Sequence, residues 1–410
     1  MAGTTHPERN PRERLLVVGG GMASVRLAEE LVARSPGGYA ITIVSKEPHA
    51  PYNRVLLSSF LAGETHERDL ALRAPDWFAA HGIVLLSGAG VASIDAERQQ
   101  ALLGDGTRLA YDRLVLATGS NALRLPIPGN ALPGVLAFRD LDDVRRLRVA
   151  APGSRAVVIG GGLLGIEAAY GLARRGLAVT LLHIMPRLME RQLDARAAML
   201  LKEAMQRKGI EVLLEAQTTA IEGNGNAERV LLKDGRRLPA ELVVMAAGIR
   251  PETALARSMG LEVGRAIKVG DTLETSRPRV YAIGECAEHR GTCYGIVEPA
   301  YEQARVLAAH LAGQSAAYAG SVMAVSLKVS GVPVFSMGDY EGQDADIITL
   351  EDQAAGTYRK LVVRDGRLVG VVLFGDTGDA FWYRELITQG TPLAKLRPQL
   401  AFGKAYAEAA

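Results

Sequence analysis

The chain contains the same run of structural signals twice, and this duplication limits its possible folds more than any other feature. Each copy begins with a short apolar run, 15–18 or 156–159, that leads into three consecutive glycines. Each copy then passes an Asp-Gly pair between apolar runs and reaches a strand-like run that ends in glycine, Gly119 or Gly248. Asp-Gly between such runs predicts a hairpin whose two turn residues both have positive φ. A strand, a glycine turn, a helix and a second strand make a dinucleotide-binding fold, so we expect two Rossmann-like folds in one α/β chain.

The C-terminal part carries a different pattern. A third Asp-Gly pair lies between the runs 358–363 and 367–374, and no glycine fingerprint precedes it. We therefore expect a small C-terminal α+β domain at 321–410. The first dinucleotide fold is predicted to be discontinuous, at 14–124 and 249–320, with the second at 125–248.

Composition excludes several classes of partner. Hydrophobic residues make up 48% and charged residues 22% of the chain, as in an ordinary globular protein. The net charge of +2 gives no reason to propose a nucleic acid or membrane surface as partner. No apolar run approaches the roughly 20 residues of a membrane span, and residues 1–14 lack the apolar core of a signal peptide. With only two cysteines, a reducing, cytoplasmic location is the default expectation.

The first glycine turn has the residues that a bound pyrophosphate requires. Gly19 allows the tight bend, Gly21 allows close approach of the backbone, and Ser24 is small enough for the third position. An acid is expected to hold a ribose hydroxyl after the second strand. The first carboxylate after the run 40–44 is Glu47, which is therefore the candidate; the alternative is a solvated loop glutamate.

The second turn is complete, with Gly160, Gly162 and Gly165, and Glu167 follows two residues later. Its second strand ends at His183 rather than at an acid. A carboxylate at that position would favour NADH, because it would repel the 2′-phosphate of NADPH. Arg187 lies nearby, either as a ligand of that phosphate or as an ordinary surface arginine. Charge alone therefore does not decide between NADH and NADPH.

These motifs resemble those of the two-dinucleotide-domain flavoprotein reductases of the glutathione reductase class. The marks are both glycine turns, residues 117–119 and residues 281–287. The resemblance implies that the first fold, with Thr118, Gly119 and Gly284, binds FAD, and that the second fold, with Gly248, binds the nicotinamide nucleotide. It places Glu285, where the family usually has aspartate, beside the ribityl chain and flavin phosphate.

A closer resemblance, to the reductase part of the assimilatory nitrite reductase large subunit and to the electron-transfer subunit of assimilatory nitrate reductase, covers nearly the whole chain. It is carried by residues 51–60, 183–194, 299–304 and 327–332. Related ferredoxin reductases imply that Arg54 and Arg124 contact the flavin, although Ser59 stands where those enzymes have lysine. They also imply that Glu167 lies near the nicotinamide; the alternative is a glutamate stabilised by the helix dipole.

The resulting hypothesis is an FAD-dependent NAD(P)H oxidoreductase that passes electrons from NADH, or alternatively NADPH, through the flavin to a redox protein. Cys286 and Cys293 supply neither a four-cysteine cluster for sirohaem chemistry nor a redox disulfide, so we expect two idle thiols and no metal site. The acceptor is then another protein, such as a nitrate or nitrite reductase or an iron–sulfur protein. The alternatives are a rubredoxin or ferredoxin–NAD(+) reductase of another pathway, an NADH oxidase, and a flavoprotein that acts mainly as a redox-sensing binding protein.

Overall fold

The computed structural model describes residues 12–327 and 329–407, so most of the N-terminal segment considered above lies outside the described residues. The contacts divide the chain into two compact units, each of which is described by itself. The first comprises residues up to Asn53, Leu70–Asn121 and Pro251–Ser321. The second comprises Arg54–Asp69, Ala122–Arg250 and the chain from Val322 onward. These divisions differ from the sequence-based domain boundaries, which stay a prediction.

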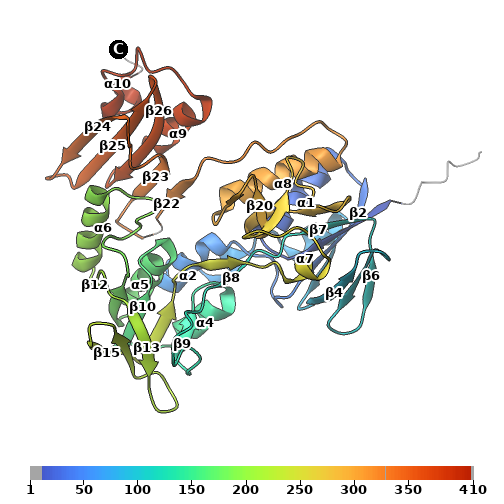
Figure 1. Ribbon diagram of the computed structural model, residues 1–410, viewed down its shortest axis with the longest axis horizontal. Coiled ribbons are helices and arrows are strands. Elements are labelled where there is room, and N and C mark those ends of the chain that lie inside the picture. Colours follow the sequence, from blue (N-terminus) through green and yellow to red (C-terminus); the bar gives the residue numbers. More distant parts are fainter. Residues whose placement is uncertain (1–11, 328, 408–410) are drawn as a thin grey trace, which may run out of the picture. The chain divides into compact units, whose positions relative to one another are not determined.

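The first unit is built on a five-stranded parallel sheet with the order β19-β7-β1-β2-β3. Strand β1 forms where the run 15–18 is buried on both faces, as expected for a central parallel strand. Helices α1 and α8 lie side by side in this unit (Figure 1). The bounds of these elements are β1 Glu13–Val18, β2 Tyr39–Ser45, β3 Val84–Ser87, β7 Arg113–Leu116, β19 Val280–Ala282, α1 Met22–Arg34 and α8 Val297–Leu311.

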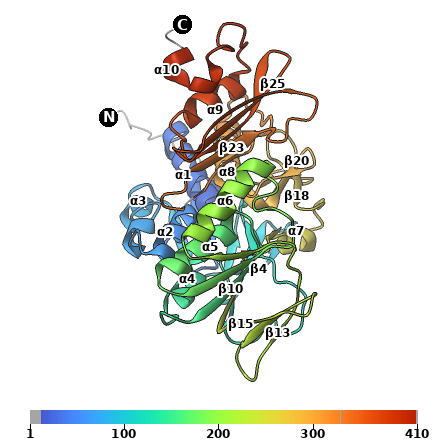
Figure 2. The same cartoon turned by 90° about the vertical axis from the view of Figure 1, so that its left-hand side faces the viewer.

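The second unit repeats this sheet, with the order β9-β16-β10-β11-β12 and parallel pairing throughout. Its glycine turn leads into helix α5, and α2 packs beside α5 and α4 (Figure 2). The duplicated Rossmann-like plan predicted from the sequence is thus confirmed. The bounds are β9 Val135–Ala137, β10 Arg155–Ile159, β11 Ala178–Leu182, β12 Glu211–Leu213, β16 Leu242–Met245, α2 Leu57–Ala62, α4 Leu141–Arg148, α5 Leu163–Arg174 and α6 Ala195–Arg207.

An ion pair repeats with the sheets. Arg14, at the start of β1, forms a salt bridge of 2.7 Å with Asp112, just before β7. Arg155, at the start of β10, pairs at 2.8 Å with Glu241, just before β16. In both folds the backbone N–H of the arginine also donates to the same carboxylate, so each acid joins two neighbouring parallel strands.

Each fold also carries a three-stranded antiparallel sheet formed around its Asp-Gly pair. The predicted turn geometry is wrong for these two hairpins, because only Gly106 and Gly235 have positive φ. The side chains of Asp105 and Asp234 instead accept the N–H two residues later, which keeps each aspartate in an ordinary conformation. The strands are β4 Val91–Asp95, β5 Gln100–Leu103 and β6 Arg108–Ala110, and β13 Thr218–Glu222, β14 Arg229–Leu232 and β15 Arg237–Pro239.

The C-terminal part forms a five-stranded antiparallel sheet with helix α9 on one face, which confirms the expected α+β domain. Here both turn residues of the hairpin, Asp365 and Gly366, do have positive φ. A buried carboxylate connects this sheet to α6: Asp194 caps that helix, accepts 2.7 Å from the hydroxyl of Tyr358 and lies 3.5 Å from Nζ of Lys360. The bounds are β22 Ala324–Ser326, β23 Val334–Gly338, β24 Asp346–Asp352, β25 Thr357–Arg364, β26 Arg367–Phe374 and α9 Ala380–Gln389.

The remaining elements are short. No helix within the described ranges combines the length and the apolar character that crossing a bilayer requires. These elements are β8 Ser120–Ala122, β17 Ile249–Pro251, β18 Ile267–Val269, β20 Ala287–His289, β21 Thr292–Cys293, α3 Pro75–Ala80, α7 Ala254–Ser258, α10 Lys404–Ala407, and the 3₁₀ turns Arg54–Leu56, Glu67–Leu70, Gly284–Cys286 and Leu400–Phe402.

Candidate functional site

The first glycine turn is fixed by the strands on either side of it. Gly19 has a φ of 119°, and a Cβ there would lie 2.1 Å from the carbonyl oxygen of Ala117. Its N–H donates to the carbonyl of Val44 at 2.8 Å, at the end of β2. Only glycine fits such a position, so this turn is built into the fold whether or not a ligand is bound.

Gly21 behaves differently from Gly19. It is the N-cap of α1 and makes no side-chain cap, and a Cβ on it would meet nothing within 4 Å among the described residues. Packing therefore does not require glycine here. Open space in front of an uncapped helix N-terminus suits an anionic pyrophosphate.

The third position shows how serine substitutes for glycine. The hydroxyl of the fully buried Ser24 donates 2.5 Å to the carbonyl of Gly19. The helix thus stands off from the turn by the length of one hydrogen bond, and the substitution is accommodated without an unpaired hydroxyl.

Three predicted flavin-binding residues come together beside this turn. A Cβ on Gly284 would lie 3.3 Å from Cβ of Ala23, in the first turn of α1. Glu285 accepts 2.6 Å from the hydroxyl of Ser120, and its carboxylate lies 4.0 Å from the Cβ position of Gly119. Gly284 therefore lies against the first turn of α1, and Glu285, the next residue, lies beside Gly119.

The backbone near Gly284 is held by residues whose role the sequence did not indicate. The N–H of Gly284 donates 2.7 Å to the side-chain oxygen of Gln303, which is fully buried in α8. Thr118, in contrast, turns its hydroxyl toward the carbonyl of Glu252 at 2.7 Å. Ser120 had no recognisable signal, because it acts across a long stretch of sequence. Gln303 lies in the run 299–304, but nothing in that run indicated that it holds the backbone of Gly284.

Glu47 lies two residues beyond the end of β2. Its carboxylate accepts 2.7 Å from the hydroxyl of Tyr52. The residue that packs against the turn is Ser45, since a Cβ on Gly20 would lie 2.5 Å from the Cβ of that serine. The contact of Glu47 with a ribose stays a prediction.

The second glycine turn repeats the first in its geometry. Gly160 has a φ of 125°, its N–H donates 2.8 Å to Leu182, and a Cβ would lie 2.3 Å from the carbonyl oxygen of Ala246. Gly162 is the uncapped start of α5 with nothing within 4 Å of its Cβ position among the described residues. Gly248, with a φ of 124°, has equally open surroundings within that part of the chain.

The two turns differ at the third position. A Cβ on Gly165 would lie 1.7 Å from the carbonyl oxygen of Gly160, so this helix packs directly on the turn. Two residues later, Glu167 is buried in α5, with only 4% of its surface exposed. Its role at the nicotinamide stays a prediction.

His183 occupies the position after β11 where an acid was expected. Its Nδ1 accepts 3.0 Å from the N–H of Gly161, and its Nε2 lies 2.9 Å from a carboxylate oxygen of Glu190. Arg187 pairs with Glu341 of the C-terminal part. Glu190 lies seven residues after His183, within the run 183–194, but nothing in that run indicated its contact with the histidine.

Two arginines that were expected at the flavin belong to the second unit. Nη1 of Arg54 donates 3.2 Å to the carbonyl of Arg139, and Nη1 of Arg124 donates 3.0 Å to that of Asn130. The structure does not relate either side chain to the first glycine turn, so their contact with FAD stays a prediction.

Both cysteines are free thiols. Cys286 is fully buried, and its Sγ donates to the carbonyls of Ile283 and Leu116 at 3.3 and 3.4 Å. Burial raises the pKa of Cys286 and of the half-buried Cys293. Since the thiolate is the reactive form, neither environment activates its cysteine.

Both dinucleotides therefore fit the residues present. Each fold has an uncapped helix N-terminus behind a glycine, Gly21 or Gly162, whose missing side chain leaves open space. Backbone N–H groups and the helix dipole provide the donors that a pyrophosphate needs.

Comparison with known proteins agrees with this geometry. Residues 13–315 match the pyridine nucleotide-disulphide oxidoreductase family, and 324–391 match the C-terminal domain of rubredoxin NAD+ reductase. The chain is 46% identical to the nitrite reductase [NAD(P)H] of Bacillus subtilis (strain 168), over 90% of this chain and 46% of that protein. It is 44% identical to the assimilatory nitrate reductase electron transfer subunit of the same organism, over 90% and 48%.

A solved structure is similar over its full length. It is the covalent putidaredoxin reductase–putidaredoxin complex, with a TM-score of 0.87 and 30% identity, covering 97% of each chain. Family match, sheet topology and paired glycine turns agree. The chain belongs to the pyridine nucleotide-disulphide oxidoreductase family and is an oxidoreductase that uses FAD and a nicotinamide dinucleotide.

Proposed function

We propose that this protein takes electrons from NADH onto FAD and delivers them to a separate redox protein in nitrate or nitrite assimilation. The observation that carries the proposal is the pair of open, uncapped helix N-termini at Gly21 and Gly162. Two dinucleotide sites in one chain suit electron transfer between two bound dinucleotides.

The residues of the chain supply position and charge rather than acid–base chemistry. FAD, when bound, can accept two electrons together and release them one at a time. The start of α1 holds its pyrophosphate, and Glu285, oriented by Ser120, holds the adjoining sugar chain. The start of α5 holds the nicotinamide nucleotide, with Glu167 as the buried acid of that helix.

The acceptor is assigned from the relatives. The chain spans about half the length of the curated relatives described above, 46% and 48%. Their names connect such chains with nitrite and nitrate reduction, so we propose a nitrate or nitrite reductase, or an iron–sulfur protein serving one, as the acceptor. A cytoplasmic location is part of the same proposal, in keeping with two free thiols.

Flavin reduction without oxygen and oxygen uptake in air, both measured on the purified, FAD-loaded protein, test this function. Under anaerobic conditions NADH should bleach the flavin rapidly. In air, oxygen uptake should be slow, and sustained turnover should require an added nitrate reductase or iron–sulfur acceptor. Vigorous NADH-dependent oxygen uptake without a partner would instead establish an oxidase. Absence of bleaching with both NADH and NADPH would leave a binding protein.

Turnover with rubredoxin or a dioxygenase ferredoxin, but not with a nitrate or nitrite reductase, would show that the protein is a rubredoxin or ferredoxin reductase of another pathway. This second experiment separates the acceptor from the reaction, because flavin bleaching would be unchanged.

A further inference from the structure

The environment of His183 points to a specific nucleotide choice. In a Rossmann fold the residue at the end of the second strand lies beside the adenosine ribose, where an acid binds the 2′-hydroxyl and repels a 2′-phosphate. Here that residue is a histidine, and a Cβ on Gly161 would lie 2.6 Å from its Cγ. The imidazole thus lies directly against the glycine turn.

The hydrogen bonds of this ring define its orientation. The N–H of Gly161 donates to Nδ1, so the ring hydrogen is on Nε2 and points to Glu190, 2.9 Å away. The histidine is 7% exposed, whereas the side chain of Glu190 is 23% exposed. The ring is therefore an internal support, and the carboxylate is the group that it presents at the edge of the fold.

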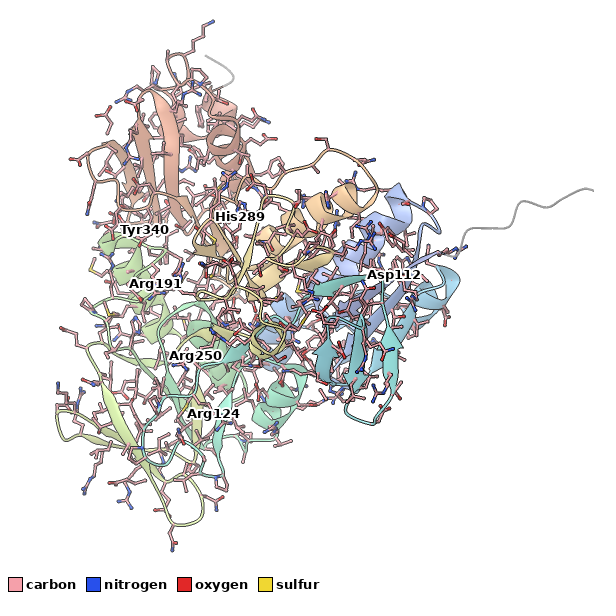
Figure 3. All side chains as sticks on the ribbon, turned by 45° about the vertical axis from the view of Figure 1, so that its right-hand side comes forward. Asp112, Arg124, Arg191, Arg250, His289 and Tyr340 are labelled. Carbon is pink, nitrogen blue, oxygen red and sulfur yellow. The ribbon has the colours of Figure 1, made fainter. Side chains whose placement is uncertain are left out.

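The C-terminal part of the second unit holds this arrangement in place. The hydroxyl of Tyr340 donates 3.0 Å to the backbone carbonyl of Glu190. Glu341 forms an ion pair with Arg187, whose Nη2 also lies 3.4 Å from that carbonyl. Figure 3 shows Tyr340 and Arg191 near each other, where the C-terminal sheet meets the second dinucleotide fold.

The charges therefore disfavour a second phosphate. The guanidinium of Arg187 is neutralised by Glu341, and Nε of the 87%-exposed Arg191 lies 3.9 Å from Glu190. An arginine already paired with a carboxylate has its charge largely offset, so it attracts a phosphate less strongly than a free arginine would. The carboxylate of Glu190 would repel a phosphate dianion at this edge.

We propose that Glu190, oriented by His183, replaces the missing strand-end acid, and that Glu341 withholds Arg187, so that the protein selects NADH over NADPH. The inference rests on the proposed function, and it gives the C-terminal domain a part in choosing the electron donor. Glu190 and Glu341 are specificity residues for the adenosine end of the nucleotide.

The test uses a matched pair of probes, 5′-AMP and adenosine 2′,5′-bisphosphate, which differ only in the 2′-phosphate. Calorimetry on the FAD-loaded protein should show that the bisphosphate binds about tenfold more weakly or worse. Glu190→Gln keeps an oxygen to accept from His183 but removes the charge. It should reduce this discrimination severalfold, and Glu190→Ala should reduce it further.

Glu341→Gln should also reduce the discrimination, because it releases Arg187. The control is Glu351→Gln, which breaks the comparable ion pair of the C-terminal sheet with Arg196 on α6 but leaves the residues around His183 untouched. The same order should appear in the ratio of kcat/KM for NADH and NADPH.

Equal binding of the two probes to the wild-type protein would overturn the inference. So would variants at 190 and 341 whose discrimination equals that of Glu351→Gln. These outcomes are distinct from failure of the proposed function, because the probes are bound whether or not the flavin is reduced.

Discussion

The two dinucleotide-binding folds share their sheet order, their turn conformations and an Arg–acid ion pair, but they differ where the helix meets the turn. In the first fold, Ser24 separates helix and turn by a hydrogen bond to Gly19. In the second, Gly165 leaves no room for a side chain, with 1.7 Å between its Cβ position and Gly160. The two folds therefore pack the helix on the turn in two different ways. We do not expect serine to fit at 165, or glycine to replace serine at 24 without loss of stability.

The largest loss of stability should come from placing serine, the residue of the first fold, at the third position of the second fold. Gly165→Ser puts a side chain onto a backbone carbonyl that cannot move away, so we expect a loss of roughly 3 kcal/mol or more in the free energy of unfolding. Denaturant titration checks this, with Ala173→Ser on the same helix as the control. A loss no greater than the control's would show that the two third positions are interchangeable.

The next effect separates the ligands of the two folds. A Cβ at Gly21 or Gly162 meets nothing within 4 Å among the described residues, so valine at either position fills the open space in front of the helix. Gly21→Val should purify without FAD. Gly162→Val should keep FAD and raise the KM for the nicotinamide nucleotide about tenfold or more, as expected from losing hydrogen bonds to a charged group.

Visible flavin absorbance and steady-state kinetics report these two outcomes, and each variant is the control for the other. A fully yellow Gly21→Val protein, or an unchanged KM in Gly162→Val, would contradict the assignment of one dinucleotide to each fold.

A smaller loss of stability is expected when Ser24 of the first fold is replaced. Ser24→Ala removes the hydrogen bond to Gly19 and should cost about 1 kcal/mol of unfolding free energy. Ser24→Gly adds the flexibility of a helical glycine, for about 2 kcal/mol in total. If Ser24→Gly were as stable as the wild type, the serine would be a neutral replacement rather than a packing device.

The smallest effect concerns the duplicated ion pair. The guanidinium and backbone N–H of Arg14 lower the pKa of Asp112 to about 2, and Arg155 likewise lowers the pKa of Glu241. Because the folded-state pKa of Asp112 lies below the unfolded value of about 3.9, its contribution is present above pH ~4 and is lost as the pH falls toward 2.

For a pair this exposed, about 0.5 kcal/mol is expected. The difference in unfolding free energy between wild type and Asp112→Asn should therefore shrink between pH 5 and about pH 3. Denaturant titration at both values measures it. A difference that does not change with pH would show that the aspartate acts only as a hydrogen-bond acceptor.

Much of the fold could be predicted because it is written in local patterns. Each pattern involves residues that are close in the sequence: the apolar runs 15–18 and 156–159, the glycine turns and the Asp-Gly pairs. Because each pattern occurs in both copies, the two copies support the same interpretation. The pairing of Arg14 with Asp112 spans 98 residues, and no local pattern indicates it. Its repetition at Arg155 and Glu241 was nevertheless a signal in the aligned copies.

The parts of the site that local sequence indicates most directly are the glycines required by geometry. Gly19 and Gly160 have conformations that other residues rarely adopt. The replacement of a strand-end acid by His183 with Glu190 could not be predicted, because it depends on a turn that brings back a residue seven positions later. The hairpin geometry failed for a similar reason, since Asp105 and Asp234 use their side chains instead of a positive φ.

The shared carboxylate of Asp194 sets a rule for building hybrid reductases. Asp194 caps α6, accepts a hydrogen bond from Tyr358 and lies beside Lys360. This one carboxylate therefore connects the C-terminal sheet to the second dinucleotide fold. A chimera that exchanges the chain from residue 324 onward must keep tyrosine and lysine at 358 and 360, or bring its own helix α6. Donor domains that lack this match would leave the buried Asp194 with its cap of α6 but without its two partners in the sheet, however well their surfaces suit a new acceptor.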